Sequence, residues 1–229
     1  MTIAAALDQI RGRLRAAELT NARPAGSVAL IAVSKLQPPE AIREAYAAGQ
    51  RDFGENYVQE LAQKAEALRD LPAVRWHLIG HLQRNKAKQI ASLVSLVHTV
   101  DSIELARELA KRHGAGSDRR LPVLIEVSIA GEAQKHGIAP ADVGEVADAI
   151  DALPELSLRG LMCVPPLTAD PADARPHFDA LARLRDHHGG AARLPELSMG
   201  MTADFEHAVA AGATLVRVGT AIFGARQAP

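Results

Sequence analysis

Eight short apolar runs alternate with helical patterns along the 229-residue chain, and this alternation limits the fold more than any other feature. Apolar strands joined by helices are typical of a parallel sheet that is covered on both faces. Eight such units predict a single closed barrel, the (β/α)8 TIM barrel, spanning residues 1–229 as one domain. The runs cover residues 28–35, 51–56, 74–80, 93–100, 121–128, 156–164, 195–199 and 214–219.

Two details of the pattern qualify the barrel prediction. The second and seventh runs are weak, so an open, doubly wound sheet is the alternative. The helix after the eighth run is expected to be missing or minimal. An amphipathic stretch at residues 3–19 lies outside the repeat, and we expect an extra N-terminal helix there.

Composition excludes several classes of protein. The chain has 26 Lys plus Arg and 27 Asp plus Glu, a net charge of −1, which argues against a nucleic-acid or membrane-surface binder. No apolar run approaches the roughly 18 residues of a membrane span, and no signal-peptide pattern is present. The single cysteine, Cys163, suits a reducing compartment. We therefore expect a cytoplasmic protein, a monomer or weak dimer, with no motif of zinc or magnesium ligand spacing.

The first run ends in a lysine, Lys35, in the sequence "IAVSKLQPPE" of residues 31–40. Pro38 and Pro39 prevent the strand from continuing. In a βα barrel the functional groups lie at the carboxyl ends of the strands. Lys35 is therefore either a surface lysine with a buried stem or a group with a chemical role.

The loops after the last two strands favour an anion site. "SMGMTADF" (198–205) brings Ser, Gly and Thr to an expected helix start, and "VGTAIFG" (218–224) brings Gly and Thr directly after the eighth strand. Barrel phosphate sites form at these two loops, and helix starts offer free N–H groups. Ordinary helix capping would explain either loop alone; the two together favour phosphate.

Arg217 alternates with Val216 and Val218, so it is expected to point into the barrel mouth. It is either an ion-pair partner or a group that faces a ligand. Pyridoxal 5′-phosphate (PLP) needs a lysine for its aldehyde, an anion site, and a partner for its ring nitrogen. A Schiff-base aldolase for a sugar phosphate is the alternative, with Asn56 and His77 as only partial acid/base candidates.

Several long motifs resemble the pyridoxal-phosphate homeostasis proteins, a family whose fold is similar to the N-terminal domain of alanine racemase. They are "AVSKLQP", "FGENYVQE", "WHLIGHLQRNK", "HTVDS", "RGLMCVPP", "LSMGMTADFEHAVAAGAT" and "VRVGTAIFG", within residues 32–224. The resemblance implies that Lys35 carries PLP as a Schiff base and that Arg217 faces the pyridine nitrogen. It further implies phosphate contacts at Ser198, Thr202, Gly219 and Thr220, with Met199 and Gly200 in the same turn, and ring contacts at Asn56, His77 and Met162.

Departures from the family pattern are few. Thr202 stands where the family commonly has Ser, and its hydroxyl keeps the implied phosphate role. Ser128 stands at an Asn position, which leaves its role open. Lys135 is retained in the loop after the fifth strand. It is either a second lysine that takes or passes the cofactor or a solvated loop lysine.

Two features of the sequence distinguish a PLP carrier from a PLP-dependent enzyme. Arginine stays charged at any working pH, so the pyridine nitrogen that it meets stays unprotonated and the ring is a weaker electron sink. Racemases of this arrangement use a second base from another domain, and the chain ends five residues after Gly224. We therefore expect a protein that binds PLP and buffers or delivers it to apo-enzymes. The alternative is a PLP-dependent amino-acid racemase or lyase, with Cys163, His77 or Lys135 as a substitute base.

Overall fold

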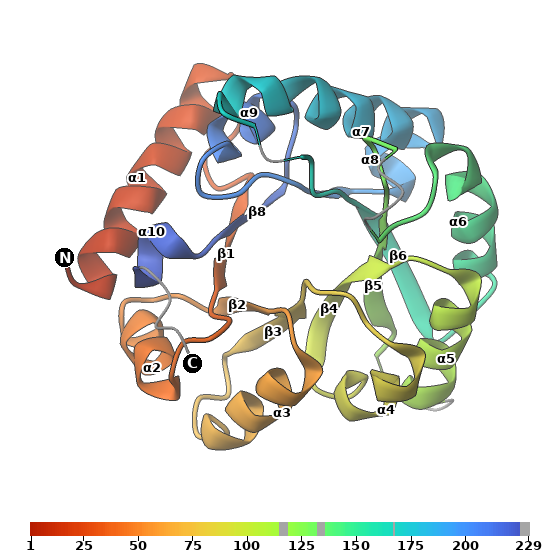
Figure 1. Ribbon diagram of the computed structural model, residues 1–229, viewed down its shortest axis with the longest axis horizontal. Coiled ribbons are helices and arrows are strands. Elements are labelled where there is room, and N and C mark those ends of the chain that lie inside the picture. The colour runs from red at the N-terminus through yellow and green to blue at the C-terminus, as the bar shows by residue number, and fades with distance from the viewer. Residues whose placement is uncertain (115–118, 132–135, 167, 225–229) are drawn as a thin grey trace.

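A computed structural model describes residues 1–114, 119–131, 136–166 and 168–224 and contains a closed barrel of eight parallel strands. The strands follow one another around the barrel in sequence order, and β8 closes it against β1 (Figure 1). The predicted barrel is confirmed, and the open sheet is excluded. The strands are β1 (Ala29–Val33), β2 (Asp52–Glu55), β3 (Arg75–Leu78), β4 (Val94–Val100), β5 (Leu121–Glu126), β6 (Leu156–Met162), β7 (Glu196–Ser198) and β8 (Leu215–Val218).

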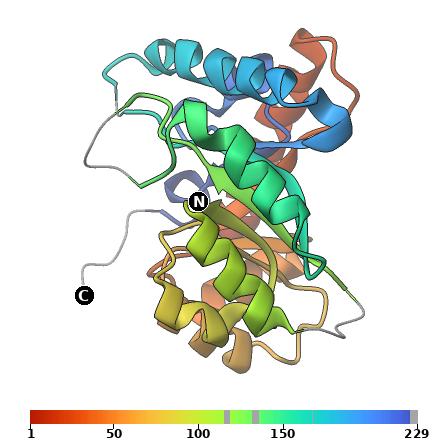
Figure 2. The same cartoon turned by 90° about the vertical axis from the view of Figure 1, so that its right-hand side faces the viewer.

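Helices form a ring outside the strands (Figure 1) and run along the barrel wall (Figure 2). The last helix has four residues, as the sequence predicted for a minimal eighth helix. Short 3-10 helices lie at Arg84–Lys86, Pro140–Asp142 and Pro171–Ala174. The α-helices are α1 (Ile3–Thr20), α2 (Pro39–Ala47), α3 (Val58–Ala67), α4 (Ala87–Ile90), α5 (Ile103–His113), α6 (Val143–Asp151), α7 (Arg175–His187), α8 (Gly190–Arg193), α9 (Phe205–Ala210) and α10 (Thr220–Phe223).

The N-terminal helix α1 completes the ring where the last two helices are short. It lies beside α9 and α10 (Figure 1) and contacts both. Thr2 caps its start by accepting a hydrogen bond from the backbone N–H of Ala5 at 3.2 Å. Leu7, Ile10 and Leu14 form its buried stripe. The predicted extra helix therefore covers a side of the barrel that α10 alone is too short to cover.

The strands have two apolar faces, as expected for a barrel inside a ring of helices. The main core lies between the strands and the helices and includes Val216 and Val218 of β8. A smaller cluster fills the barrel interior and includes Ile31, Met162 and Leu215. Since Leu215 faces inward, alternation along β8 also turns Arg217 inward. The predicted orientation of Arg217 is therefore confirmed.

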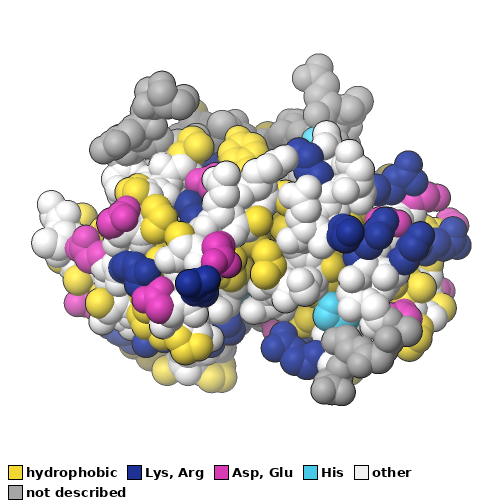
Figure 3. Space-filling view, turned by 90° about the horizontal axis from the view of Figure 1, so that it is seen from below, with side chains coloured by type: hydrophobic (Ala, Val, Ile, Leu, Met, Phe, Trp, Pro, Cys, Tyr) yellow, Lys and Arg dark blue, Asp and Glu magenta, His cyan; other side chains and the backbone are white. Residues whose placement is uncertain are grey.

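The surface carries both acidic and basic side chains. Figure 3 shows acidic and basic groups interspersed on one side of the molecule, with Lys and Arg gathered at the right-hand end of that view. Across the described ranges, no helix is both long and apolar enough to cross a membrane.

Candidate functional site

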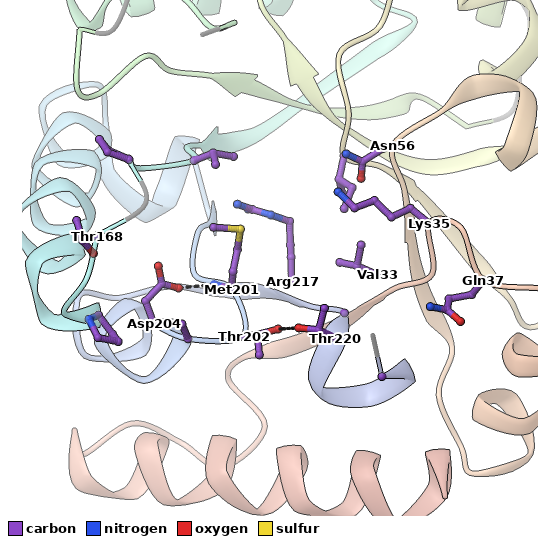
Figure 4. Close-up of a pocket in the computed structure, with 17 residues that line it drawn as sticks. Val33, Lys35, Gln37, Asn56, Thr168, Met201, Thr202, Asp204, Arg217 and Thr220 are labelled. Atoms are coloured by element: carbon purple, nitrogen blue, oxygen red, sulfur yellow. Dashed lines mark hydrogen bonds between the residues drawn. The ribbon is translucent and has the colours of Figure 1, made fainter. Parts of the chain in front are cut away.

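A cavity of about 370 Å³ opens at the carboxyl ends of the strands, where an α/β barrel places its functional groups. Its volume is in the range of small-molecule sites, roughly 300–1,000 Å³. Its lining residues belong to β1, β2, β3, β6, β7, β8 or the loops that follow them. Figure 4 shows Lys35, Asn56 and Arg217 reaching into this space, with Thr202 and Thr220 paired at its edge.

Lys35 lies in the turn directly after β1, and a buried charged cluster fixes this turn. The ammonium group of Lys64 donates hydrogen bonds to the carbonyl oxygen of Ser34 at 2.6 Å, Glu55 Oε1 at 2.8 Å and Glu60 Oε1 at 2.7 Å. The hydroxyl of Ser34 also donates to Glu55 Oε1 at 2.6 Å. These bonds fix the position of Ser34, the residue directly before Lys35.

The next residue of the turn, Leu36, has a φ of 60°, which is unusual for a branched side chain. Its backbone N–H donates to Glu60 Oε1, so the cluster also holds this conformation. Such backbone strain costs on the order of 1 kcal/mol and persists only where the surroundings fix it. Burial raises the pKa of Glu55, and its ion pair with Lys64 offsets part of that rise.

Arg217 is a buried cation at the inner wall of the cavity, with 4% of its surface exposed. Its guanidinium donates from Nη1 to Ser198 Oγ at 2.5 Å and from Nη2 to the carbonyl oxygen of Cys163 at 2.9 Å. Within the described residues, no carboxylate forms an ion pair with it; burial lowers its pKa, and the more distant Glu126 and Asp204 counter this. A buried charge without a counter-ion is costly. The site is therefore suited to a ligand atom that accepts from Arg217.

Ser198 begins a chain of hydrogen bonds through the barrel interior. Its Oγ lies 2.8 Å from His98 Nδ1, His98 Nε2 lies 3.0 Å from His77 Nδ1, and His77 Nε2 lies 3.0 Å from Asp52 Oδ1. Asp52 opens β2, so the chain ends at the opposite end of the barrel from the cavity. There Asp52 forms a two-pronged ion pair with Arg75.

Asp52 fixes the direction of the hydrogen bond at its end of this chain. Burial alone would raise its pKa, but hydrogen bonds from His77 and Arg75 lower it to about 2, so the carboxylate only accepts. His77 therefore donates from Nε2 to Asp52, and its Nδ1 lies against His98 Nε2. Burial and the neighbouring His77 lower the pKa of His98 well below its usual 6.5, so its ring is neutral, and its Nδ1 shares a hydrogen bond with the hydroxyl of Ser198.

The loops after β7 and β8 meet at the edge of the cavity. Thr220 Oγ1 lies 3.4 Å from Thr202 Oγ1, and Arg217 donates its backbone N–H to the carbonyl oxygen of Gly200 at 3.0 Å. Gly200 has a φ of +90°, and a Cβ there would lie 2.6 Å from the Cβ of Ala208. Only glycine therefore fits the turn that joins the two loops.

The helix after β7 begins later than the sequence predicted. We expected it at Thr202, but α9 begins at Phe205 and residues 202–204 form a turn. Asp204 Oδ1 accepts from the backbone N–H of Met201 at 2.6 Å, which closes this turn. The predicted helix start at Thr202 is therefore wrong, and this edge offers the two threonine hydroxyls together with the first turn of α10, which begins at Thr220.

The eleven predicted cofactor contacts fall into two groups, and contact with a cofactor stays a prediction for all of them. Lys35, Asn56, Thr202, Arg217, Gly219 and Thr220 line the cavity. His77, Met162, Ser198, Met199 and Gly200 are buried behind it. Ser198 and His77 also belong to the hydrogen-bond chain. Lys135 lies outside the described residues.

Sequence reasoning did not assign several groups of the site. Asp204 and Met201 line the cavity, and Asp52 and His98 belong to the chain that supports Arg217. The only signal for Asp204 was its place in the loop after the seventh run. No periodicity indicates that the carboxylate of Asp204 is buried there.

Two observations test whether the site fits the implied cofactor. Asn56 Oδ1 is buried and accepts no hydrogen bond from any described residue, and Arg217 has no carboxylate partner among them. Both residues line the same cavity as Lys35. A ring with an acceptor nitrogen and polar substituents would engage such groups, and the hydroxyls of Thr202 and Thr220 are suited to a phosphate. The residues present therefore fit PLP.

Comparison with known proteins gives the same family as the sequence motifs. The family described as "Alanine racemase, N-terminal domain" matches residues 6–227. The chain is 46% identical to the pyridoxal phosphate homeostasis protein of Pseudomonas aeruginosa, over 99% of this chain and 96% of that protein. It is 41% identical to the protein of the same name from Escherichia coli K12, over 98% and 97% of the two chains.

Solved structures agree with these relationships. The structure of PipY from Synechococcus elongatus PCC7942 with PLP bound has a TM-score of 0.83 and 40% identity, covering 97% of this chain and 100% of that chain. Alanine racemase from Corynebacterium glutamicum shares the fold at 19% identity, with a TM-score of 0.64 over 97% of this chain and 62% of that chain. This chain therefore belongs to the family of pyridoxal phosphate homeostasis proteins.

Proposed function

We propose that this protein binds PLP covalently at Lys35, as a Schiff base, and buffers and delivers it to apo-enzymes in intracellular vitamin B6 homeostasis. The observation that carries the proposal is that Lys35 and the buried Arg217 face one cavity. The name of the relatives and the PLP in the PipY structure support it. The role is assigned to residues 1–229 as one binding domain in the cytoplasm.

Each polar group of the cavity has a task in this proposal. PLP supplies an aldehyde and a conjugated ring that can take up electrons. Lys35 supplies the amine, and Thr202, Gly219 and Thr220 hold the phosphate. Arg217 only donates hydrogen bonds, so it keeps the ring nitrogen unprotonated and weakens the ring as an electron sink.

The cavity offers little for acid–base chemistry. Besides Lys35 and Arg217, Asp204 is the titratable side chain among its described lining residues, and its Oδ1 accepts from Met201. Burial raises the pKa of Cys163 to about 12, so its thiol is protonated at neutral pH. Both ring nitrogens of His77 are engaged inside the barrel. These features favour binding and delivery over turnover.

The absorbance spectrum tests the binding. Wild-type protein incubated with PLP is expected to show the visible band of a lysine Schiff base, and Lys35→Ala is expected to lose it. Lys88→Ala, on the helix α4 away from the cavity, serves as the control and keeps the band. A wild type that stays colourless after incubation would overturn the proposal.

Two further assays separate the carrier from the racemase or lyase. The holoprotein is incubated with a panel of L-amino acids, and chirality and products are followed; no sustained turnover is expected. Transfer of PLP to an apo-enzyme is expected to be faster from the holoprotein than from free PLP at the same concentration. Sustained turnover would replace the carrier function with the enzymatic alternative.

A further inference from the structure

His81, Asp101 and His136 gather at the carboxyl ends of three neighbouring strands, and none of them lines the cavity. His81 lies in the loop after β3, Asp101 directly follows β4, and His136 lies in the loop after β5. One nitrogen or carboxylate oxygen from each residue lies within 4.8 Å of those of the other two. These residues are far apart in the sequence, so ligand spacing could not reveal them.

We propose that His81, Asp101 and His136 bind a divalent transition metal ion such as Zn²⁺. Imidazole nitrogen and carboxylate oxygen are ligands that Zn²⁺ prefers, and three protein ligands leave a further position for water. Bonds of about 2.0–2.1 Å at tetrahedral angles put two ligand atoms roughly 3.3 Å apart. His81 Nδ1 and Asp101 Oδ2 are 3.1 Å apart, close to this spacing.

The third ligand reaches the ion by a side-chain rotation. The rings of His81 and His136 are stacked, with centroids 3.7 Å apart and planes 9° from parallel. Lone pairs of parallel rings do not converge, so His136 must turn out of the stack to share an ion with His81. Its side chain is exposed, so this rotation meets little resistance.

The charges around Asp101 also favour a cation. Burial raises the pKa of Glu126 to about 7, and the negative charge of Asp101 adds to that rise, so the two carboxylates repel each other. Glu126 Oε2 is buried and forms no hydrogen bond with any described residue. An ion at Asp101 relieves this repulsion.

Metal binding exchanges a proton for the ion. His81 Nδ1 and Asp101 Oδ2 face each other at 3.1 Å, and a bound ion takes the place of any proton between them, which leaves to solvent. The bound ion joins the loops after β3, β4 and β5 at one edge of the barrel mouth. His81 is two residues from Ile79, which lines the cavity, but the metal site does not depend on the proposed PLP function.

The test titrates Zn²⁺ into untagged, metal-stripped full-length protein by isothermal calorimetry. We expect one tight site, proton release in buffers of different ionisation enthalpy, and weaker binding at lower pH. His81→Ala and His136→Ala should each weaken binding by at least about 10-fold, as losses around metal sites do. Both side chains are exposed, so the variants should keep the wild-type unfolding midpoint.

The adjacent pair His187 and His188 at the end of α7 provides a matched control, since these rings also contact each other, at 4.9 Å between centroids. The double variant His187→Ala/His188→Ala should bind Zn²⁺ as the wild type does. Equal affinity in the wild type and in His81→Ala/His136→Ala, or no binding to the wild type at all, would overturn the proposal.

Discussion

The hydroxyl of Ser198 lies 2.8 Å from Nδ1 of His98, and both side chains are fully buried inside the barrel. Arg217 also donates to this hydroxyl. Ser198 therefore accepts from a buried cation while it shares a second hydrogen bond with a neutral ring. Arg217 is therefore anchored through Ser198 to a hydrogen-bond chain that runs to Asp52, at the opposite end of the barrel from the cavity.

Replacing Ser198 with alanine should leave His98 Nδ1 and one arm of Arg217 without a partner. A buried unsatisfied group costs about 1–3 kcal/mol, so Ser198→Ala should lower the free energy of unfolding by this amount and weaken PLP binding. Urea unfolding and an absorbance titration measure the two effects. Ser157→Ala, at a half-buried site in β6, should change stability by no more than about 0.5 kcal/mol. Equal stability in the two variants would contradict the role of Ser198.

Asp52 makes the stability of the protein depend on pH. Its pKa falls from 3.8 to about 2 on folding, so it contributes stability above pH 4 that is lost as pH falls toward 2. The difference corresponds to about 2 kcal/mol. Asp52→Asn removes this contribution, so its deficit relative to wild type should shrink between pH 5 and pH 3 in urea unfolding. A deficit that stays constant over this range would contradict the prediction.

Lys64 neutralises Glu55, whose side chain is completely buried. Lys64→Met should leave this carboxylate unpaired and lower the free energy of unfolding by about 3–5 kcal/mol. It should also weaken PLP binding, because the turn at Lys35 loses the hydrogen bond that Lys64 donates to the carbonyl oxygen of Ser34. The double variant Lys64→Met/Glu55→Gln removes the unpaired negative charge of Glu55 and should recover part of the lost stability. A double variant less stable than Lys64→Met would show that the charge is not the cause.

A comparison of alanine variants at Gly200 and Gly212 separates a steric effect from backbone strain. Both have positive φ, +90° and +98°, but a Cβ at Gly212 meets nothing within 4 Å, whereas a Cβ at Gly200 meets Ala208 at 2.6 Å. Gly200→Ala should therefore be less stable than Gly212→Ala by about 1–3 kcal/mol, the usual cost of overpacking. It should also weaken PLP binding, which Gly212→Ala should not. Thermal unfolding of both variants measures their loss of stability. Equal losses in the two variants would contradict the steric effect at Gly200.

Much of the fold could be predicted because its signals are local. Apolar runs and helical patterns repeat eight times, and the alternation of Val216, Arg217 and Val218 determines which of them faces the barrel interior. The short last helix and the extra first helix were also predicted correctly. The helix start at Thr202 was wrong because Asp204 binds the backbone of Met201 and closes a turn there, a choice that composition does not reveal.

The sequence by itself determined the barrel, the family, and the convergence of Lys35, Thr202, Arg217 and Thr220 on one rim, because parallel strands bring their carboxyl ends together. Only the tertiary structure decided what supports them. Ser198, His98, His77 and Asp52 come from four strands, and they form one chain because the closed barrel turns each of them into the same interior. Likewise, His81, Asp101 and His136 meet only where three loops lie side by side. Hydrogen-bond partners of this kind depend on distances across the fold, which no local pattern in the sequence records.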